Sequence, residues 1–256
     1  YKVPKPLIEV DGKPIIQHVV EMFPGEKKFF FICNKNHLKN KKYKIKKKIK
    51  QIAPNAKIIA INPHKLGPVH AVLESSEYLD DKEPTIVNYA DFTCFWNYKK
   101  FKKTVLDSKC DGAIPCYKSF HPHTIWSNYY AYVKEKNLKA LDIQEKQPFT
   151  KNPQMEFASS GTYYFKNGNL MKEYFKKTVK EKLLVNNEYY VSMVYQPMIK
   201  DNLNIKIFEI NHFMQWGTPQ DLEDYIYWSN CFKNLIKKRT SIKHKGTLLL
   251  PMVGVG

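Results

Sequence analysis

Short apolar runs alternate with amphipathic stretches through the first half of the chain. The runs predict buried strands at Phe29–Cys33, Lys57–Ile61, Thr85–Asn88 and Asp111–Cys116. Helical spacing of apolar positions predicts helices between them, at Lys13–Phe23, Lys35–Ile52, Val69–Leu79 and Phe95–Leu106. This alternation indicates an α/β fold of the Rossmann-like, doubly wound kind, with a mostly parallel mixed sheet.

The pattern changes after Phe120. Residues 129–147 predict two strands about a turn, and residues 155–165 predict another strand. The remaining expected elements are helices at Asn169–Lys182 and Glu188–Ile199, a strand at Ile205–Ile210, and a helix from Pro219 to about Lys237. No repeat or linker separates these parts, so a single domain over residues 1–256 is expected.

The last residues, "GTLLLPMVGVG", predict a buried strand at Leu248–Val253 followed by the turn Gly254-Val255-Gly256. A strand that leads into a glycine-rich turn is typical of a phosphate-binding loop, because glycine lets backbone N–H groups approach a phosphate closely.

The formal net charge of +18 raises the question of a nucleic-acid partner. Arg239 is the only arginine, although bidentate recognition of bases and phosphates usually employs arginine. The lysine run of residues 35–52 is better explained as the solvated face of an amphipathic helix, and a basic surface also attracts small anionic substrates. We therefore expect no nucleic-acid partner.

Two further compositional features bear on the location of the protein. No apolar run approaches the roughly 18 residues of a membrane span, so no membrane partner is expected. The cysteines are five in number and form no C-x-x-C pair, which is typical of a reduced, cytoplasmic protein.

Three places carry candidate chemistry. Pro4 and Pro6 stiffen the backbone on both sides of Lys5, which is either a phosphate-facing lysine or a surface lysine in a proline turn. Asp91 ends a hydrophobic strand, where it either holds a divalent cation or caps the next helix. His121 and His123 either hydrogen-bond a polar acceptor or decorate the surface, and no zinc site is expected there.

Six motifs in order, "PKPLIEVDGKP", "GPVHAVLES", "NYADF", "IQEKQP", "ASSGTYYF" and "WGTPQDL", resemble the sugar-phosphate nucleotidyltransferase family over essentially the whole chain. That family begins with a strand and G-x-G-[ST]-R shortly before the lysine of P-K-P. The match to this first piece is "LLLPMVGVG", so the resemblance implies a rotated chain order. A circular permutation or a segment out of order would produce it, and the first strand of a second, tandem domain is the alternative.

The resemblance implies transfer of a nucleotidyl group from an NTP to a phosphorylated acceptor, with release of pyrophosphate. Its residue roles, by motif position, are nucleotide contacts for Gly254, Gly256, Gly67, His70 and Ala71, phosphate contact for Lys5, and Mg²⁺ binding for Asp91 with Gln215 in the second ligand position. Acceptor contacts fall on Glu145, Lys146 and Gly161, with His121 and His123 beside them. A homo-oligomer is compatible with this family.

Three departures from the family pattern affect these roles. The arginine of the first loop has no counterpart, Gln147 is inserted in the E-K-P motif, and "QWGTP" has Gln215 where the family has a metal-binding aspartate. A neutral amide is a weaker Mg²⁺ ligand than a carboxylate. Glu209 or Asp221 would take over only if the geometry allowed it.

The residues within these motifs resemble those of a subgroup from capsule and surface-polysaccharide loci. This resemblance implies a CTP-dependent enzyme with phosphoglutamine as acceptor. Sugar 1-phosphates are the broader expectation for the acceptor. Two other classes are considered. A GT-A glycosyltransferase typically has D-x-D, which "ADFT" at 90–93 lacks. A non-catalytic nucleotide sensor is the other alternative, because Gln215 weakens metal binding.

Overall fold

The computed structural model describes residues 3–118 and 128–241, and its α/β architecture confirms the expected fold class. A seven-stranded sheet has the order β10-β8-β9-β12-β7-β11-β5. Its strands are β5 (Thr85–Asn88), β7 (Gly112–Tyr117), β8 (Ala131–Lys136), β9 (Lys139–Glu145), β10 (Phe157–Ser159), β11 (Thr162–Phe165) and β12 (Ile205–Glu209).

Three two-stranded ladders complete the described strands. Strands β3 (Phe30–Asn34) and β4 (Lys57–Ile61) pair in parallel, while β1 (Glu9–Val10) with β2 (Lys13–Pro14) and β6 (Phe92–Phe95) with β13 (His212–Gln215) pair antiparallel. In the large sheet only β7 with β12 is parallel among the described pairs. The antiparallel share is larger than expected because the chain after β7 turns back through tight hairpins, such as β8 to β9 at Asn137 and Leu138.

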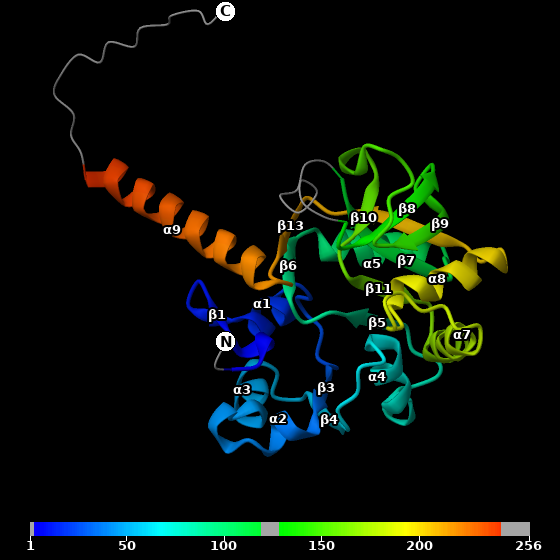
Figure 1. Cartoon of the computed structure of the whole chain (residues 1–256), viewed down its shortest axis with the longest axis horizontal. Coiled ribbons are helices and arrows are strands. Elements are labelled where there is room, and N and C mark those ends of the chain that lie inside the picture. Colours follow the sequence, from blue (N-terminus) through cyan, green and yellow to red (C-terminus); the bar gives the residue numbers. More distant parts are fainter. Residues whose placement is uncertain (1–2, 119–127, 242–256) are drawn as a thin grey trace, which may run out of the picture.

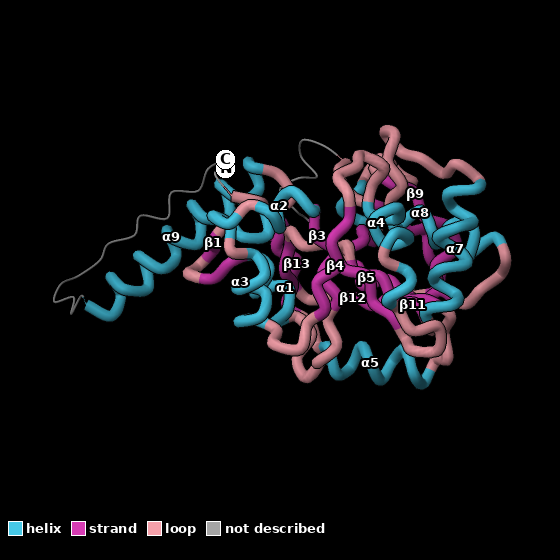
Figure 2. Tube along the Cα trace, turned by 90° about the horizontal axis from the view of Figure 1, so that it is seen from below, coloured by secondary structure: helices cyan, strands magenta, loops and turns pink. Residues whose placement is uncertain are grey.

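Helices lie around these sheets (Figures 1 and 2). They are α1 (Ile15–Glu21), α2 (Lys35–Lys39), α3 (Ile45–Ile52), α4 (Pro68–Glu74), α5 (Tyr98–Asp107), α7 (Gly168–Lys180), α8 (Val191–Lys200) and α9 (Pro219–Ser241), with short 3₁₀ turns at Lys5–Leu7, Lys41–Tyr43, Ser76–Tyr78 and Pro153–Met155. None of the helices within the described ranges is long and apolar enough to cross a bilayer.

Three apolar clusters form the core. The first packs α4, α7 and α8 on one face of the large sheet, with Val72, Phe175 and Val194 in its interior. The second contains Phe101 of α5 on the other face. The third joins α1, α3 and β3 to the start of α9 through Trp216 and Leu222. The sheet is therefore covered on both faces, as the unbroken apolar runs predicted.

Three local expectations were wrong. Residues 35–52 form α2, a 3₁₀ turn and α3 rather than one helix, because the side chains of Asn34 and Asn40 each cap a new helical start and Lys44 is left-handed at φ 50°. The single strand expected at residues 155–165 is split into β10 and β11 at Ser160-Gly161. Strand β13 was not expected, because "HFMQ" is not the continuous apolar run by which the other short strands were predicted.

Helix α9 extends away from the rest of the molecule (Figure 1). Its first turns pack on the third cluster, and the carboxylate of Asp11 accepts hydrogen bonds from Tyr225, Ser229 and Lys233 along one face of the helix. Several large apolar side chains of α9 that do not belong to this contact, Trp228 and Phe232 among them, are exposed. The strand expected at Leu248–Val253 lies outside the described residues.

Candidate active site

Lys5 and Asp91 come together from distant parts of the chain. Lys5 lies in the 3₁₀ turn that follows Pro4, and Asp91 follows the carboxyl end of β5. The Lys5 Nζ lies 3.2 Å from Oδ2 of Asp91 and donates to the carbonyl oxygen of Gly217 at 2.5 Å. Both side chains remain partly exposed, at 44% and 33%. The pair is thus accessible to an anionic ligand and its counter-ion.

The segment after β13 closes the other side of this pair. The Trp216 N–H donates to the Asp91 carbonyl oxygen at 2.9 Å, which fixes the end of β13 against the end of β5. A Cβ added at Gly217 would lie 3.5 Å from the Tyr130 hydroxyl and 3.7 Å from Oδ2 of Asp91. Tyr130 therefore borders the Lys5–Asp91 pair, although no motif or pattern identified it in advance.

Gln215 is buried beside this segment, at 6% exposure. Its amide nitrogen donates to Oδ1 of Asp221 at 2.5 Å, while its Oε1 is buried without a hydrogen-bond partner. The other oxygen of Asp221 accepts the Thr218 N–H, so Asp221 caps α9, and its negative charge adds to the burial that raises the pKa of Tyr130. Glu209 ends β12 on the surface.

These donors test whether a metal ion fits. Among the described residues no group of three or more histidine, cysteine, aspartate or glutamate side chains could hold one. The carboxylate of Asp91 and the unpartnered Oε1 of Gln215 are both oxygen donors, the kind that Mg²⁺ prefers. Only Asp91 of the two lines the large cavity, so it is the donor that could hold a Mg²⁺ ion whose remaining ligands come from nucleotide phosphates and water.

The "GPVHAV" motif begins helix α4. Gly67 has φ 86°, and a Cβ there would lie 2.7 Å from both N and O of Tyr189. The chain makes this close approach because Tyr189 N–H donates to the Leu66 carbonyl and Val69 N–H donates to the Tyr189 carbonyl. The Nε2 atom of His70 lies 3.0 Å from Oε1 of Glu74, and the His70 ring contacts the ring of His64.

Replacing Gly67 with alanine is expected to lower the free energy of unfolding by about 2–4 kcal/mol, because the methyl group meets the Tyr189 backbone in an already unfavourable φ region. Gly12→Ala is the matched control, since Gly12 has φ 80° but nothing within 4 Å of its added Cβ. It should cost only about 1 kcal/mol. Equal effects of the two substitutions in urea unfolding would show that the contact with Tyr189 is unimportant.

Glu145 and Lys146 stand at the end of β9. The Glu145 carboxylate accepts a hydrogen bond from Ser192 at 2.5 Å, and the Lys146 ammonium donates to the Tyr190 hydroxyl at 2.7 Å. Burial raises the pKa of Glu145 to about 7, and the Ser192 hydrogen bond and the charge of Lys146 only partly oppose it. Glu145 thus titrates near neutral pH, where it can change the charge of the site.

Two tyrosines are influenced by the charges of both Glu145 and Asp91. Burial raises the pKa of Tyr89 and of Tyr130, and the charges of both carboxylates add to this effect. The Tyr89 hydroxyl also accepts the Val191 N–H, and its own N–H donates to the Gly161 carbonyl. Gly161, at φ 93°, lies against the rings of Tyr89 and Phe92. Sequence reasoning missed Tyr89, Tyr130 and Ser192, because aromatic and hydroxyl residues are common in any core.

A cavity of about 1010 Å³ is lined by some of these residues. Lys5, Asp91, Ala71 and Tyr190 line it, and Pro68 brings the start of α4 to its wall. The lining residues do not include Gly67, His70, Glu145, Lys146, Gly161 or Gln215. His121, His123, Gly254 and Gly256 lie outside the described residues.

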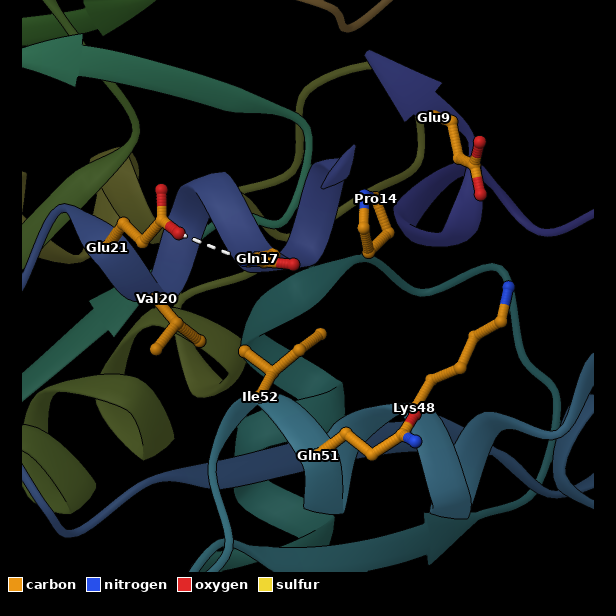
Figure 3. A pocket seen from close by; sticks show the side chains of 8 residues that line it. All are labelled: Glu9, Pro14, Gln17, Val20, Glu21, Lys48, Gln51 and Ile52. Atoms are coloured by element: carbon orange, nitrogen blue, oxygen red, sulfur yellow. Dashed lines mark hydrogen bonds between the residues drawn. The ribbon is translucent and has the colours of Figure 1, made fainter. Parts of the chain in front are cut away.

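A second cavity, of about 360 Å³, lies between α1 and α3 (Figure 3). Its acidic lining residues are Glu9 and Glu21, and Glu21 accepts hydrogen bonds from Gln17 and Lys13. These partners satisfy the carboxylate in a surface network, and none of the residues assigned by motif lines this cavity. The larger cavity is therefore the candidate active site.

Comparison with known proteins adds an independent line of evidence. A family model described as nucleotidyl transferase matches residues 1–229. The bifunctional protein GlmU of Thermosipho africanus (strain TCF52B) is 22% identical over 193 residues, which is 75% of this chain but only 39% of that protein. The chain thus spans about two fifths of the length of this curated relative.

Solved structures share the fold. A nucleoside-diphosphate-sugar pyrophosphorylase from Vibrio cholerae RC9 superimposes with a TM-score of 0.67 at 18% identity, covering 89% of this chain and 93% of that one. A UDP-glucose pyrophosphorylase complexed with UDP-glucose gives 0.68 at 18% identity, with 91% of each chain covered.

Proposed function

We propose that this chain, which belongs to the nucleotidyl transferase family, catalyses transfer of a nucleotidyl group from an NTP to a phosphorylated acceptor with release of pyrophosphate. The observation that carries the proposal is the Lys5–Asp91 pair, which lies 3.2 Å apart at the wall of the large cavity. A phosphate-binding cation and a cation-binding carboxylate in contact are what a reaction between two phosphorylated substrates requires.

The reaction needs no covalent intermediate with the protein. The acceptor phosphate attacks the α-phosphorus in line and pyrophosphate leaves, so positioning and charge neutralisation supply the catalysis. Lys5 would leave Asp91 to contact the phosphates, and Asp91 with Gln215 would hold Mg²⁺. A bound Mg²⁺ would neutralise charge on the triphosphate. Ala71 and Gly67, with His70 nearby, would border the base.

The acceptor would lie on the Glu145 side of the cavity. Lys146 donates a hydrogen bond to Tyr190, which lines the cavity, and Ser192 donates to Glu145, the residue before Lys146. Gly161 leaves room for the rings of Tyr89 and Phe92 beneath the acceptor. His121 and His123 are the further acceptor contacts in this proposal.

The finer substrate assignment rests on the wording of the motifs. We assign CTP as the nucleotide and phosphoglutamine or a sugar 1-phosphate as the acceptor, in the cytoplasmic synthesis of precursors for a capsule or surface polysaccharide. The large lysine excess, 42 Lys and Arg against 24 Asp and Glu, supports a small anionic substrate pair. A homo-oligomer is compatible with this function.

A screen of the four NTPs against phosphoglutamine and a set of sugar 1-phosphates tests the proposal. Pyrophosphate should appear only when an NTP and an acceptor are both present, with CTP the fastest. Release of a nucleoside diphosphate would instead identify a glycosyltransferase. Nucleotide binding without any turnover would identify a sensor, the alternative that the Gln215 substitution favours.

Metal binding should depend on nucleotide. Without NTP, Lys5 occupies Asp91 and Gln215 offers only a neutral oxygen, so Mg²⁺ should bind the free protein with a dissociation constant in the millimolar range or weaker. With a non-hydrolysable NTP the phosphates add ligands, and the affinity should rise by about tenfold or more. Calorimetry measures both constants, and tight Mg²⁺ binding to the free protein would contradict this ligand set.

A further inference from the structure

A chain of hydrogen bonds in the core connects two of the proposed acceptor contacts, Glu145 and Gly161. The Ser192 hydroxyl lies 2.5 Å from Oε2 of Glu145, and Ser192 is also hydrogen-bonded to the Tyr163 hydroxyl. The Tyr163 hydroxyl lies 3.0 Å from Oγ of Ser159, which lies 3.2 Å from the backbone nitrogen of Gly161. Ser192, Tyr163 and Ser159 thus form a relay of three hydroxyl groups between a carboxylate and a peptide N–H.

The three hydroxyl residues of the relay are closed off from solvent. Ser192 is 0% exposed, Ser159 is 1% exposed and Tyr163 is 2% exposed. A buried hydroxyl cannot exchange its partner for water, so a hydrogen bond that it leaves unmade costs free energy. Each hydroxyl has one proton to donate and an oxygen that can accept. The groups at the two ends therefore decide which hydroxyl donates to which.

The two ends give all the hydrogen bonds of the relay one direction. The Gly161 N–H can only donate, so Oγ of Ser159 accepts it. An ionised Glu145 can only accept, so the Ser192 hydroxyl donates to it. Between them, Ser159 donates to the Tyr163 oxygen, and Tyr163 donates to the Ser192 oxygen. Every donor then has an acceptor, and hydrogen bonds aligned in this way strengthen one another.

The reversed direction is unfavourable. If Glu145 were protonated and donated to Ser192, each hydroxyl would point the other way. Oγ of Ser159 would then receive two protons, one from Tyr163 and one from the Gly161 N–H. The hydroxyl proton of Ser159 would have no acceptor within the relay, which is costly in the core. The relay therefore favours the charged carboxylate and opposes the burial that raises the pKa of Glu145.

Other titratable groups face Glu145 as well. The Lys146 ammonium favours the charged carboxylate, as the hydrogen bond from Ser192 does. The hydroxyls of Tyr89, Tyr130 and Tyr190 lie in the field of Glu145, which helps to raise their pKa values, so they carry no charge at neutral pH. Lys146 and the relay are thus the two influences that stabilise the negative charge of Glu145.

We infer that Tyr163 is a positioning residue for the acceptor, because the relay that it completes sets the charge and orientation of Glu145 together with those of the Gly161 peptide. Gly161 is fixed on its other side as well, since its carbonyl oxygen accepts the Tyr89 N–H. An acceptor that contacts both Glu145 and Gly161 therefore meets two groups that one network holds. The inference rests on the proposed function, in which these two residues bind the acceptor.

Titration of Glu145 in the substrate-free chain tests the relay. The carboxyl ¹³C resonance of Glu145 reports its pKa, and Ser192→Ala, Tyr163→Phe and Ser159→Ala each break the relay at a different point. Each should raise the pKa of Glu145, by about one unit for Ser192→Ala and about half a unit for the two others. If only Ser192→Ala raised the pKa, the effect would be that of a single hydrogen bond, and the relay would be overturned.

Tyr195→Phe is the matched control for Tyr163→Phe. Tyr195 is also fully buried, and its ring centroid lies 5.8 Å from that of Tyr163, but its hydroxyl donates to the Tyr164 carbonyl. The control therefore removes the same atom from the same apolar cluster without breaking the relay, and it should leave the pKa of Glu145 unchanged. An equal rise in the control would show that the cluster as a whole sets this pKa, and the inference would fail.

Kinetics then test the link to the acceptor. With the best substrate pair from the screen, Tyr163→Phe should raise the KM for the acceptor by about three- to tenfold and move its pH dependence to higher pH. The turnover number and the KM for the NTP should stay within about twofold, because Lys5 and Asp91 lie outside the relay. A native KM for the acceptor despite a shifted Glu145 pKa would overturn the positioning role. The titration uses no substrate, so it decides the relay even if nucleotidyl transfer is not observed.

Discussion

Replacing Asp91 with asparagine is expected to reduce the turnover number by about 10²-fold or more, while the melting temperature stays close to that of the native chain. The amide keeps the shape of the side chain but removes the charge that would hold Mg²⁺. Lys5→Ala should cause a loss of similar size, because its ammonium lies 3.2 Å from the Asp91 carboxylate and would contact the phosphates. Both variants are assayed for pyrophosphate release with the best substrate pair from the screen.

Matched surface substitutions separate these effects from a general loss of charge. Asp107→Asn removes a carboxylate that pairs with Lys103 on the exposed side of α5, and Lys13→Ala removes a lysine that pairs with Glu21. Neither residue touches the large cavity, and both variants should keep turnover within about twofold. If Asp91→Asn or Lys5→Ala kept near-native turnover, that residue would have no part in the mechanism.

Glu145→Gln should raise the KM for the acceptor by about 10- to 100-fold, because a charge-assisted hydrogen bond is replaced by a neutral one. In the native chain KM should fall as the pH rises through about 7, where burial places the pKa of Glu145 and the carboxylate becomes charged. The variant should show a flat profile over the same range. A pH-dependent KM that survives in the glutamine variant would assign the titration to another group.

Glu145 should also affect stability: as the pH rises, acceptor binding should improve while the free energy of unfolding falls. The folded pKa of Glu145, about 7, lies above its ordinary value of 4.5, so the folded state binds the proton more tightly. The free energy of unfolding therefore falls as the pH rises from about 4.5 to 7, by at most about 3 kcal/mol. Urea unfolding of Glu145→Gln should show no such fall in the free energy of unfolding. If the variant kept the fall, its cause would be a group other than Glu145.

The sequence predicted the structure best where a continuous run of apolar residues forms a buried strand. Strands β4 and β5 begin and end where their apolar runs predicted, at Lys57–Ile61 and Thr85–Asn88. It failed where polar side chains bond to their own backbone. The apolar periodicity of residues 35–52 favours one continuous helix. The Asn40 side chain instead accepts a hydrogen bond from the backbone N–H of Lys42, which starts a new helical turn and breaks the helix.

The candidate site was predictable only in part, for a related reason. Lys5 in its proline turn and Asp91 after a strand were candidates from position, the family resemblance assigned their roles, and the structure brings them into contact. The Gln215 side chain was identified by its motif, but its bond to Asp221 depends on the α9 cap and has no sequence signal. Tyr89 and Tyr130 come under the influence of the two carboxylates only through tertiary folding.

The hydrogen bonds between Asp11 and helix α9 determine which part of the molecule unfolds first. One carboxylate holds three donors along the helix, Tyr225, Ser229 and Lys233, while the apolar anchoring is confined to the first turns of α9 around Leu222. The outer part of α9 is thus a unit of low local stability that can open while the sheet stays intact. A protease should cut there first and release a shortened chain before global denaturation begins, and Asp11→Ala should hasten that first cut.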